Sequence, residues 1–322
     1  MTVTVVTPDA IDFGAYASLQ RASFASLLTR SGVADDFMSP DYYQWKYQPP
    51  AGPARVAIAL EHGEMVGSLG MFPLRIAARG HELIGWQFCD GATAPQKRGL
   101  GYFAECVRAL HAQLGPDELS FGFPNANSRR SFGEIGWRET QTVTTFAGVI
   151  PLTPRLRGDE DLVEFDLAND MPNARTAAEN SRPGLVRDAA YLRWRYGRHP
   201  LRPYSVYVRR TGGGADGYIV LREASIAGRR AVLVMELHAS SPAVETALLA
   251  KAADWGVQHG IRYIVMVSNC LSGWTALKRG FVLLPSRLLP KRQTLMGAGT
   301  TPDADAVMNE DWLVQMGDWD AF

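Results

Sequence analysis

The chain has 322 residues, which is long enough for two domains with sizeable hydrophobic cores. Hydrophobic residues make up 46% and charged residues 20%, as in an ordinary globular protein. Lys plus Arg and Asp plus Glu balance at 33 each, which excludes a global charge that would attract nucleic acid or an anionic membrane. The three cysteines, Cys89, Cys106 and Cys270, have neither metal-ligand nor redox-motif spacing. We therefore expect no bound metal.

The start of the chain predicts a strand rather than a targeting signal. Residues Met1–Val6 carry no basic region and soon reach Pro8. No apolar run approaches the length that crosses a membrane. We expect a cytoplasmic protein, monomeric or homodimeric, with neither a membrane nor a nucleic-acid partner.

The first half predicts an alternation of strands and helices. A strand and a helix come first, then three strands, a helix, a strand, a short helix and a final strand. His62-Gly63 predicts a hairpin turn between two of the strands. The predicted segments are Thr2–Thr7, Asp12–Thr29, Arg55–Glu61, Glu64–Leu74, Glu82–Ala94, the segment from Tyr102, Glu118–Phe123, the segment ending at Gly136, and the strand from Trp137.

An aromatic and basic segment, Tyr42–Tyr47, precedes these strands. Its rings could stack on nucleic-acid bases or line a cleft for a sugar or aromatic ligand. The spacing also fits a helix that lays its rings on a hydrophobic core, and the neutral charge favours this interpretation.

The most informative segment is Gln96-Lys97-Arg98-Gly99-Leu100-Gly101, which lies between a predicted strand and a predicted helix. Two glycines one residue apart allow backbone amides to turn toward a common centre. The N-terminus of the following helix adds unpaired N–H groups and a positive dipole end. Lys97 and Arg98 bring further positive charge. The loop therefore suits a pyrophosphate, but it is neither a Walker loop nor the dinucleotide fingerprint.

A second motif, Phe121–Ser128, ends a short strand at Pro124. Asn125 lies where a helix N-cap belongs, and Gly136 before Trp137 suits a C-cap. Capping a helix is one role for Asn125, and contact with a ligand is another.

Together the two motifs resemble the GCN5-related N-acetyltransferase (GNAT) superfamily over about residues 1–150. The resemblance implies that the loop binds acetyl-CoA, and that the strand end beside it admits the thioester. The cofactor contacts that it implies are Gly91, Ala92, Thr93, Ala94, Gln96, Lys97, Arg98, Gly99, Leu100, Gly101, Tyr102, Asn125, Asn127 and Ser128. Gly91 would permit a close backbone approach.

The second half repeats the first. Tyr42–Tyr47 matches Tyr191–Tyr196, and Asn125-x-x-Ser128 matches Asn269-x-x-Ser272 at nearly the same offset. Between these anchors we predict the strands Tyr204–Arg209, Asp216–Glu223 and Ala231–His238, the helix Ala243–His259 and the strand Ile261–Val267.

The predicted fold class is α/β (α+β), with two tandem GNAT-like domains that each have a mixed, mostly antiparallel sheet flanked by helices. The predicted divisions are an acetyl-CoA-binding domain at 1–150, a linker with one short helix at 151–186, and a degenerate GNAT-like domain with a C-terminal tail at 187–322. The second copy has His238–Glu245 in place of the glycine loop, so we expect one cofactor site. In this asymmetry the chain resembles tandem members of the superfamily and the related FemAB-like proteins. Trp312, Trp319 and Phe322 are expected to dock the tail on the second domain.

The resemblance implies direct attack of an amine on the thioester, and the catalytic candidates are Asp90, Glu236 and Ser128. Asp90 lies on the strand facing the thioester, or is bonded within a turn. Glu236 lies either buried with a partner or in a cleft, where burial would raise its pKa. His238 is a further candidate. In many members of the superfamily a tyrosine of the short helix acts as the general acid that protonates the departing thiolate. Ser131 and Phe132 occupy that region here, so Ser128 or water would protonate the thiolate.

The expected activity is transfer of an acetyl group to a small primary amine, of the amino sugar or amino acid type, in an interdomain cleft. A catalytically inactive sensor of acyl-CoA or another small ligand is the alternative, favoured by the missing tyrosine. Transfer of a longer acyl group would need a deeper apolar tunnel beyond Phe88.

Overall fold

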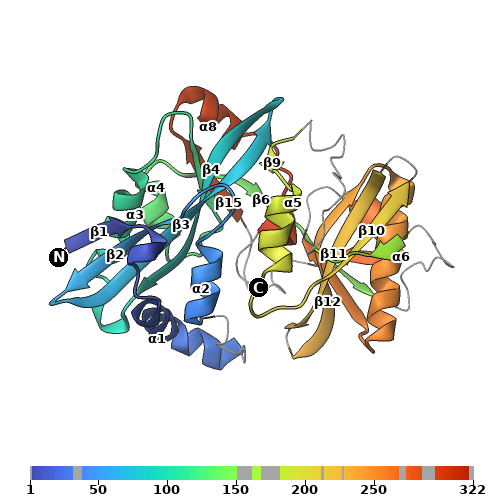
Figure 1. Cartoon of the computed structure of the whole chain (residues 1–322), viewed down its shortest axis with the longest axis horizontal. Coiled ribbons are helices and arrows are strands. Elements are labelled where there is room, and N and C mark those ends of the chain that lie inside the picture. The colour runs from blue at the N-terminus through green and yellow to red at the C-terminus, as the bar shows by residue number, and fades with distance from the viewer. Residues whose placement is uncertain are drawn as a thin grey trace.

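A computed structural model describes residues 2–31, 38–150, 162–167, 182–211, 214–226, 228–267, 273–284 and 294–318. Two mostly antiparallel sheets, each flanked by helices, lie side by side (Figure 1). The predicted α/β fold class is confirmed.

The first sheet has seven strands in a row and one short strand beside them. All its contacts are antiparallel except the parallel pair β4–β5. In spatial order the strands are β1 (Thr2–Val6), β2 (Arg55–Glu61), β3 (Glu64–Ala78), β4 (His81–Thr93), β5 (Leu119–Gly122), β15 (Thr294–Gly299) and β6 (Arg138–Thr142), with β9 (Gly184–Leu185) on β3. The helices of this half are α1 (Phe13–Ser31), α2 (Pro40–Lys46), α3 (Tyr102–His111), α4 (Arg129–Gly133) and α8 (Pro302–Met308).

The second sheet also has one parallel contact, between β12 and β13. Its spatial order is β8 (Leu162–Glu164), β10 (Ser205–Thr211), β11 (Gly214–Ile226), β12 (Arg229–Ala239), β13 (Tyr263–Val267), β7 (Thr145–Val149) and β14 (Phe281–Leu283). Its helices are α5 (Ala189–Leu192), which continues into the π-helical turn η5 (Arg193–Gly197), α6 (Pro242–Gln258) and α7 (Gly273–Lys278).

The two sheets have the same strand plan, and each takes its sixth strand from the far half of the chain. In the first sheet β15 lies between β5 and β6, and in the second sheet β7 lies between β13 and β14. In Figure 1 the red elements β15 and α8 accordingly lie among the blue and green ones. The sheets thus exchange one strand each across the boundaries at 150 and 187, because strand pairing depends on tertiary contacts rather than on chain order.

The connection at 151–186 contributes strands where it is described. Leu162–Glu164 pairs with β10 and Gly184–Leu185 pairs with β3, so this segment adds a strand to each sheet. The predicted short helix of this linker falls on residues outside the described part.

The expectation that the tail docks on the second half is wrong for Trp312. Its ring packs on Phe121 of β5, with centroids 5.6 Å apart, and its backbone bonds with the Gln141 side chain of β6. The crossing of β15 into the first sheet brings the tail to this place. Trp319 and Phe322 lie outside the described residues, as do Asn269 and Ser272.

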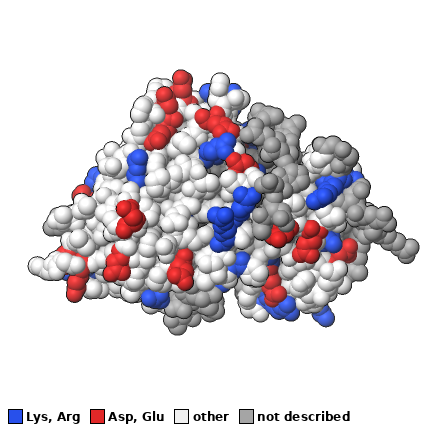
Figure 2. Space-filling model, viewed as in Figure 1, with Lys and Arg blue, Asp and Glu red and all other residues white. Residues whose placement is uncertain are grey.

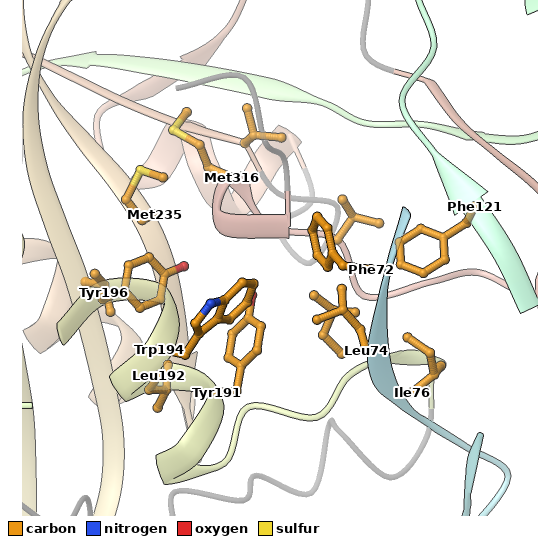
Figure 3. Packing of buried hydrophobic residues seen from close by; sticks show 14 of the residues in the cluster. Phe72, Leu74, Ile76, Phe121, Tyr191, Leu192, Trp194, Tyr196, Met235 and Met316 are labelled. Carbon is orange, nitrogen blue, oxygen red and sulfur yellow. The ribbon is translucent and has the colours of Figure 1, made fainter. Parts of the chain in front are cut away.

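One hydrophobic cluster joins the two halves (Figure 3). It combines Phe72 and Leu74 of β3 with Trp194 and Tyr196 of η5 and with Met235 of β12. Burial of large aromatic and aliphatic side chains contributes about 1.5–3 kcal/mol each. The halves therefore share part of their core.

Local signals place the helix of the Tyr42–Tyr47 segment as predicted. The Ser39 side chain accepts a hydrogen bond from the Tyr42 N–H, and Pro40 occupies the first turn of α2. Tyr42 and Tyr43 are buried, so these rings belong to the core. His62 and Gly63 both have positive φ, as the predicted hairpin turn requires.

Acidic and basic residues are interspersed on the face shown in Figure 2. No helix in the described part is long and apolar enough to span a membrane. Within the same residues no group of three or more His, Cys, Asp or Glu side chains is placed to hold a metal.

Candidate active site

The loop at residues 96–101 connects β4 to α3 by a short 3-10 turn and two left-handed glycines. Gly99 has φ 79° and Gly101, the N-cap of α3, has φ 88°. Among the described residues, no atom lies within 4 Å of a Cβ added to either glycine. The first N–H groups of α3 have no intrahelical acceptor and face this end of the helix. The loop can therefore bind an anion through its backbone.

The two basic side chains of the loop, which were expected to bring positive charge to it, also contact the protein. Lys97 forms an ion pair with Glu61, which also accepts a hydrogen bond of 2.8 Å from Tyr102. Arg98 donates to the Ser23 backbone oxygen at 2.5 Å. These bonds fix the loop to β2 and α1, so a ligand there would depend mainly on backbone amides.

Beside the loop, β4 and β5 diverge. They pair in parallel only from Gly85–Leu119 to Gln87–Phe121. A Cβ on Gly122 would lie 3.0 Å from the Phe88 oxygen, so Gly122 permits the last close approach of the two strands. Beyond that point β4 continues to Thr93, and in the described part of the chain the ladder pairs between β4 and β5 do not extend this far.

The end of β4 is held from the other side by β3 and α1. Ala92 and Thr93 pair with Ser68 and Gly67. The Thr93 oxygen also accepts from Ser23, and the Ala94 N–H donates to the Val66 oxygen at 2.9 Å. Gly91 is needed for a reason that the sequence did not suggest: a Cβ there would lie 2.5 Å from the ring of Phe103.

Asp90 occupies a β-bulge of β4 and has φ 53°. Its carboxylate accepts hydrogen bonds of 2.8 Å from both Lys46 and Tyr47. Its backbone oxygen accepts from the Gln20 side chain at 2.6 Å and from the Tyr16 hydroxyl at 3.4 Å. The sequence indicated none of these four partners, although the segment holding Lys46 and Tyr47 was noted for its aromatic residues.

The Asn125 motif forms a turn before α4. The Asn125 side-chain oxygen accepts from the backbone N–H groups of Asn127 and Ser128, at 2.9 and 3.2 Å. The Ser128 hydroxyl donates to the Asn125 backbone oxygen. The local capping role of Asn125 is thus present. Asn125 and Asn127 remain exposed.

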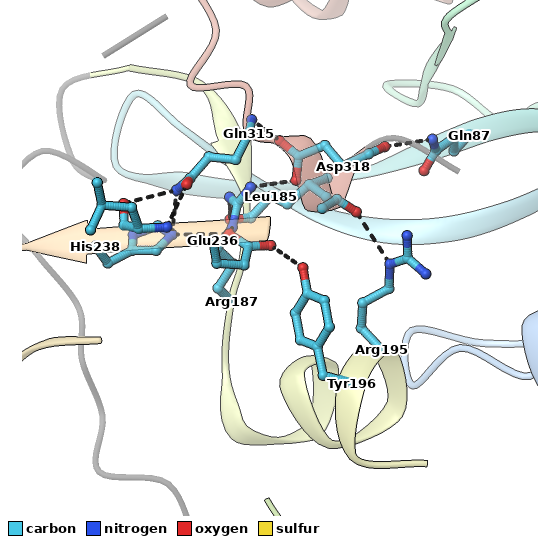
Figure 4. A network of polar contacts seen from close by, with 11 residues as sticks. Gln87, Leu185, Arg187, Arg195, Tyr196, Glu236, His238, Gln315 and Asp318 are labelled. Atoms are coloured by element: carbon cyan, nitrogen blue, oxygen red, sulfur yellow. Dashed lines mark hydrogen bonds and ion pairs between the residues drawn. The ribbon is translucent and has the colours of Figure 1, made fainter. Parts of the chain in front are cut away.

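Glu236 is fully buried in a network between the halves (Figure 4). Its carboxylate accepts from Arg187 at 2.5 Å and from Tyr196 at 2.7 Å, and lies 3.2 Å from His238. Burial alone would raise the pKa of Glu236, but Arg187, His238 and Tyr196 lower it to about 2. The expectation of a raised pKa is therefore wrong, because these donors outweigh desolvation. Arg187 also pairs with Asp318.

The same network ties the tail to both sheets. The Asp318 oxygens accept from Arg187 and from the Gln315 N–H, while its backbone oxygen accepts from Gln87 of β4 at 2.8 Å. His238 is buried and stacks on Tyr218, with centroids 4.7 Å apart. Asp90 lies on β4 and Glu236 on β12, which hold the same position in the two sheets and each carry a β-bulge. The contacts of Glu236, however, are those of a carboxylate with a structural role.

The second half has a closed helix end where the first has its loop. The Ser241 side chain accepts from the Val244 N–H, and Pro242 removes one N–H from the first turn of α6. Glu245 forms an ion pair with Arg279. A capped N-terminus with an acidic residue does not suit a pyrophosphate.

Comparison with known proteins agrees with this difference between the halves. Residues 10–140 match the model of the acetyltransferase (GNAT) domain, and this span contains the loop, the diverging strands and α4. None of the curated proteins that were compared matches the sequence.

Solved structures of GNAT proteins share the fold of the chain. A GCN5-related N-acetyltransferase from Anabaena variabilis matches with a TM-score of 0.64 at 12% identity. The match covers 92% of this chain and 72% of the Anabaena chain. The corresponding protein from Kribbella flavida has a TM-score of 0.59 at 15% identity, covering 94% and 72%. At these identities the likeness is one of fold. In both cases the likeness extends over nearly the whole chain.

Proposed function

We propose that the chain transfers the acetyl group of acetyl-CoA to a primary amine of a small molecule, of the amino sugar or amino acid type. The observation that carries this proposal is the loop at 96–101, which opens at the N-terminus of α3 beside the point where β4 leaves β5. Backbone N–H groups there suit the pyrophosphate, and the end of β4 beyond its pairs with β5 suits the pantetheine arm.

In the proposed reaction the amine attacks the thioester carbonyl directly. The new C–N bond forms, the C–S bond breaks, and the thiolate leaves with the electron pair. Asp90 is the proposed base, because it lies on the bulge of β4 next to the strand divergence. Ser128, or water, is the proposed proton donor to the thiolate. Glu236 is proposed to act only by holding the two halves together.

The cofactor contacts named from the sequence remain proposals, with backbone amides of residues 99–104 as the principal ones. We also propose one cofactor site in a tandem of two domains, 1–150 and 187–322, joined by 151–186. The shared strand plan and the capped N-terminus of α6 support this proposal. An interdomain acceptor site follows from it, in a monomer or a homodimer.

An acyl-CoA sensor without turnover is the second candidate. It is favoured by Phe132, which lies in the region where many members of the superfamily have a tyrosine that acts as the general acid. Phe132 is buried against Phe88 and Trp137.

Release of free thiol from acetyl-CoA, measured over a panel of amino sugars and amino acids, separates the two candidates. Acyl transfer predicts release with at least one acceptor, and loss of about a hundredfold in kcat for Asp90→Asn if Asp90 is the base. Asparagine tolerates the positive φ at this position, so the substitution retains the bulge. Acetyl-CoA binding without release on any amine would support the sensor instead.

A further inference from the structure

The second sheet holds an arginine whose guanidinium has no ion pair within the described residues. Arg222 lies on β11, where its side-chain neighbours on the same face are the core residues Val220 and Ala224. It is 6% exposed, and its Nε makes no hydrogen bond to any residue that the structure describes. The described residues offer the guanidinium neither a hydrogen bond nor an ion pair. A buried guanidinium is normally paired, because burial of an uncompensated charge is costly.

Two further unused donors lie beside it. Ser205 pairs with Leu221, so Tyr204 is directly across from Arg222, and the guanidinium carbon lies 5.9 Å from the Tyr204 ring centroid. The Tyr204 hydroxyl is buried and has no hydrogen-bond partner in the described part of the chain. The His199 ring lies 5.6 Å from the Tyr204 ring.

The tautomer of His199 follows from its backbone contacts. Nδ1 accepts from the N–H groups of Leu201 and Arg202, at 3.2 and 3.1 Å, so the ring proton of the neutral form is on Nε2. That N–H makes no hydrogen bond within the described part of the chain. Three donors of different types are therefore left without acceptors at one place.

The charge around these donors is positive. Burial lowers the pKa of Arg222, and the nearby Arg202 and Arg195 lower it further. Burial and the same arginines lower the pKa of His199 to about 3, so the ring is neutral at physiological pH. No carboxylate is among the groups that most affect either residue. An anion would relieve this repulsion and supply the missing acceptors.

A cavity of about 700 Å³ opens beside the cluster, with His199, Arg202 and Tyr204 in its lining. Its lining also includes Glu164 and Asp166, whose side chains are exposed. The cavity is large enough for a small organic molecule.

We propose that Arg222, Tyr204 and His199 bind the oxyanion group, carboxylate or phosphate, of a small-molecule ligand that occupies this cavity. The ligand would extend past His199 and Tyr204 of the lining to Arg222, which lies beside the Tyr204 ring and outside the lining. A planar guanidinium suits two-point contact with either group, and the Tyr204 hydroxyl and the His199 N–H supply two further hydrogen bonds. The His199 ring also packs against Tyr42 and Trp45 of α2. The cavity itself is lined by residues 164–167, by Tyr196 and Gly197 of η5, and by residues between His199 and Val206. It is separate from the loop at 96–101, and the inference is independent of acyl transfer.

Thermal unfolding in inorganic phosphate, in acetate and in sodium chloride of matched ionic strength tests the proposal. A ligand that binds only the folded protein raises the Tm in a saturable way. We expect such a rise with phosphate or acetate but not with chloride, and the ion with the larger rise identifies the group. Arg222→Met should weaken the apparent binding at least tenfold. Tyr204→Phe, which removes only an unpaired hydroxyl, should weaken it severalfold.

Two controls separate this site from other anion sites. Arg230→Met, on the adjacent strand β12, removes an exposed arginine that pairs with Glu223 and should leave the rise unchanged. Gly99→Glu, which obstructs the 96–101 loop, should also leave it unchanged. The proposal is overturned if neither ion raises the Tm of the parent protein in a saturable way. It is equally overturned if the rise persists in both Arg222→Met and Tyr204→Phe, or disappears only in Gly99→Glu.

Discussion

Trp45 and Trp194 exchange hydrogen bonds across the two halves. The Trp45 indole N–H donates to the Trp194 backbone oxygen at 2.9 Å, and the Trp194 indole N–H donates to the Trp45 oxygen at 3.1 Å. Their rings stack with centroids 5.5 Å apart and planes inclined by 22°. The helices that carry them are capped alike, by Ser39 before Tyr42 and by Asp188 before Tyr191. The repeated sequence thus forms a nearly symmetric contact between the halves.

These two reciprocal hydrogen bonds predict that Trp45 and Trp194 are energetically coupled. Trp194→Ala should lower the free energy of unfolding by about 3 kcal/mol, because it leaves a cavity in the shared core. Trp45→Phe, which removes the N–H but keeps a ring, should cost about 1 kcal/mol. Denaturant unfolding of both variants and of the double variant measures the coupling, and strictly additive losses would contradict a direct interaction.

The ion pair between Lys46 and Asp90 predicts a large cost when one partner is removed. The side chains of Lys46 and Asp90 are 2% and 14% exposed. Lys46→Met should destabilise the protein by about 3 kcal/mol, since it leaves a carboxylate largely buried without its cation. Adding Asp90→Asn should recover part of the loss.

An exposed ion pair provides the matched control. The side chains of Arg138 and Asp305 are 58% and 29% exposed. Arg138→Met should cost less than about 1 kcal/mol in the same denaturant experiment. Equal losses for Lys46→Met and Arg138→Met would show that the Lys46–Asp90 pair has no special role.

The exchange of β7 and β15 predicts that the halves depend on each other. A fragment of residues 1–150 lacks β15, which pairs with both β5 and β6. We expect this fragment to lack a cooperative thermal transition, while the full chain unfolds in a single transition. A well-folded fragment with sharp, dispersed amide resonances would contradict this role of β15.

The lowered pKa of His199 predicts that the protein loses stability in acid. This pKa is about 3 in the folded protein and near 6.5 when unfolded. Between these values the unfolded chain binds a proton that the folded chain does not, so stability falls as the pH drops from about 6.5 toward 3. His199→Asn should make the free energy of unfolding less dependent on pH in this window. An unchanged slope would mean that His199 does not carry this effect.

The local features of the fold could be predicted from the sequence. The hairpin at His62-Gly63, the helix from Tyr102 and the glycine loop depend on neighbours in the chain, and the structure has them close to the expected residues. The exchange of strands could not be predicted, because β15 is a short segment whose pairing with β5 is decided by tertiary contacts.

The side-chain contacts of the candidate site also could not be predicted from the sequence. No sequence pattern indicates that Lys46 contacts Asp90, because the two residues are 44 positions apart. Glu236 was open to two interpretations, and the partner that decides between them, Arg187, comes from the predicted linker boundary. Burial and pairing in three dimensions determine such roles.

The central claim is that the 96–101 loop holds acetyl-CoA, and calorimetric titration tests it most directly. Gly99→Glu places a bulky negative charge in the open space of the loop, at a position with φ 79°. Gly63→Glu is the matched control, because Gly63 has φ 84° and equally open surroundings in the β2–β3 turn. We predict saturable binding by the parent protein and by Gly63→Glu, and at least tenfold weaker binding by Gly99→Glu. Absence of binding by the parent protein, or equal affinity in all three proteins, would contradict the assignment.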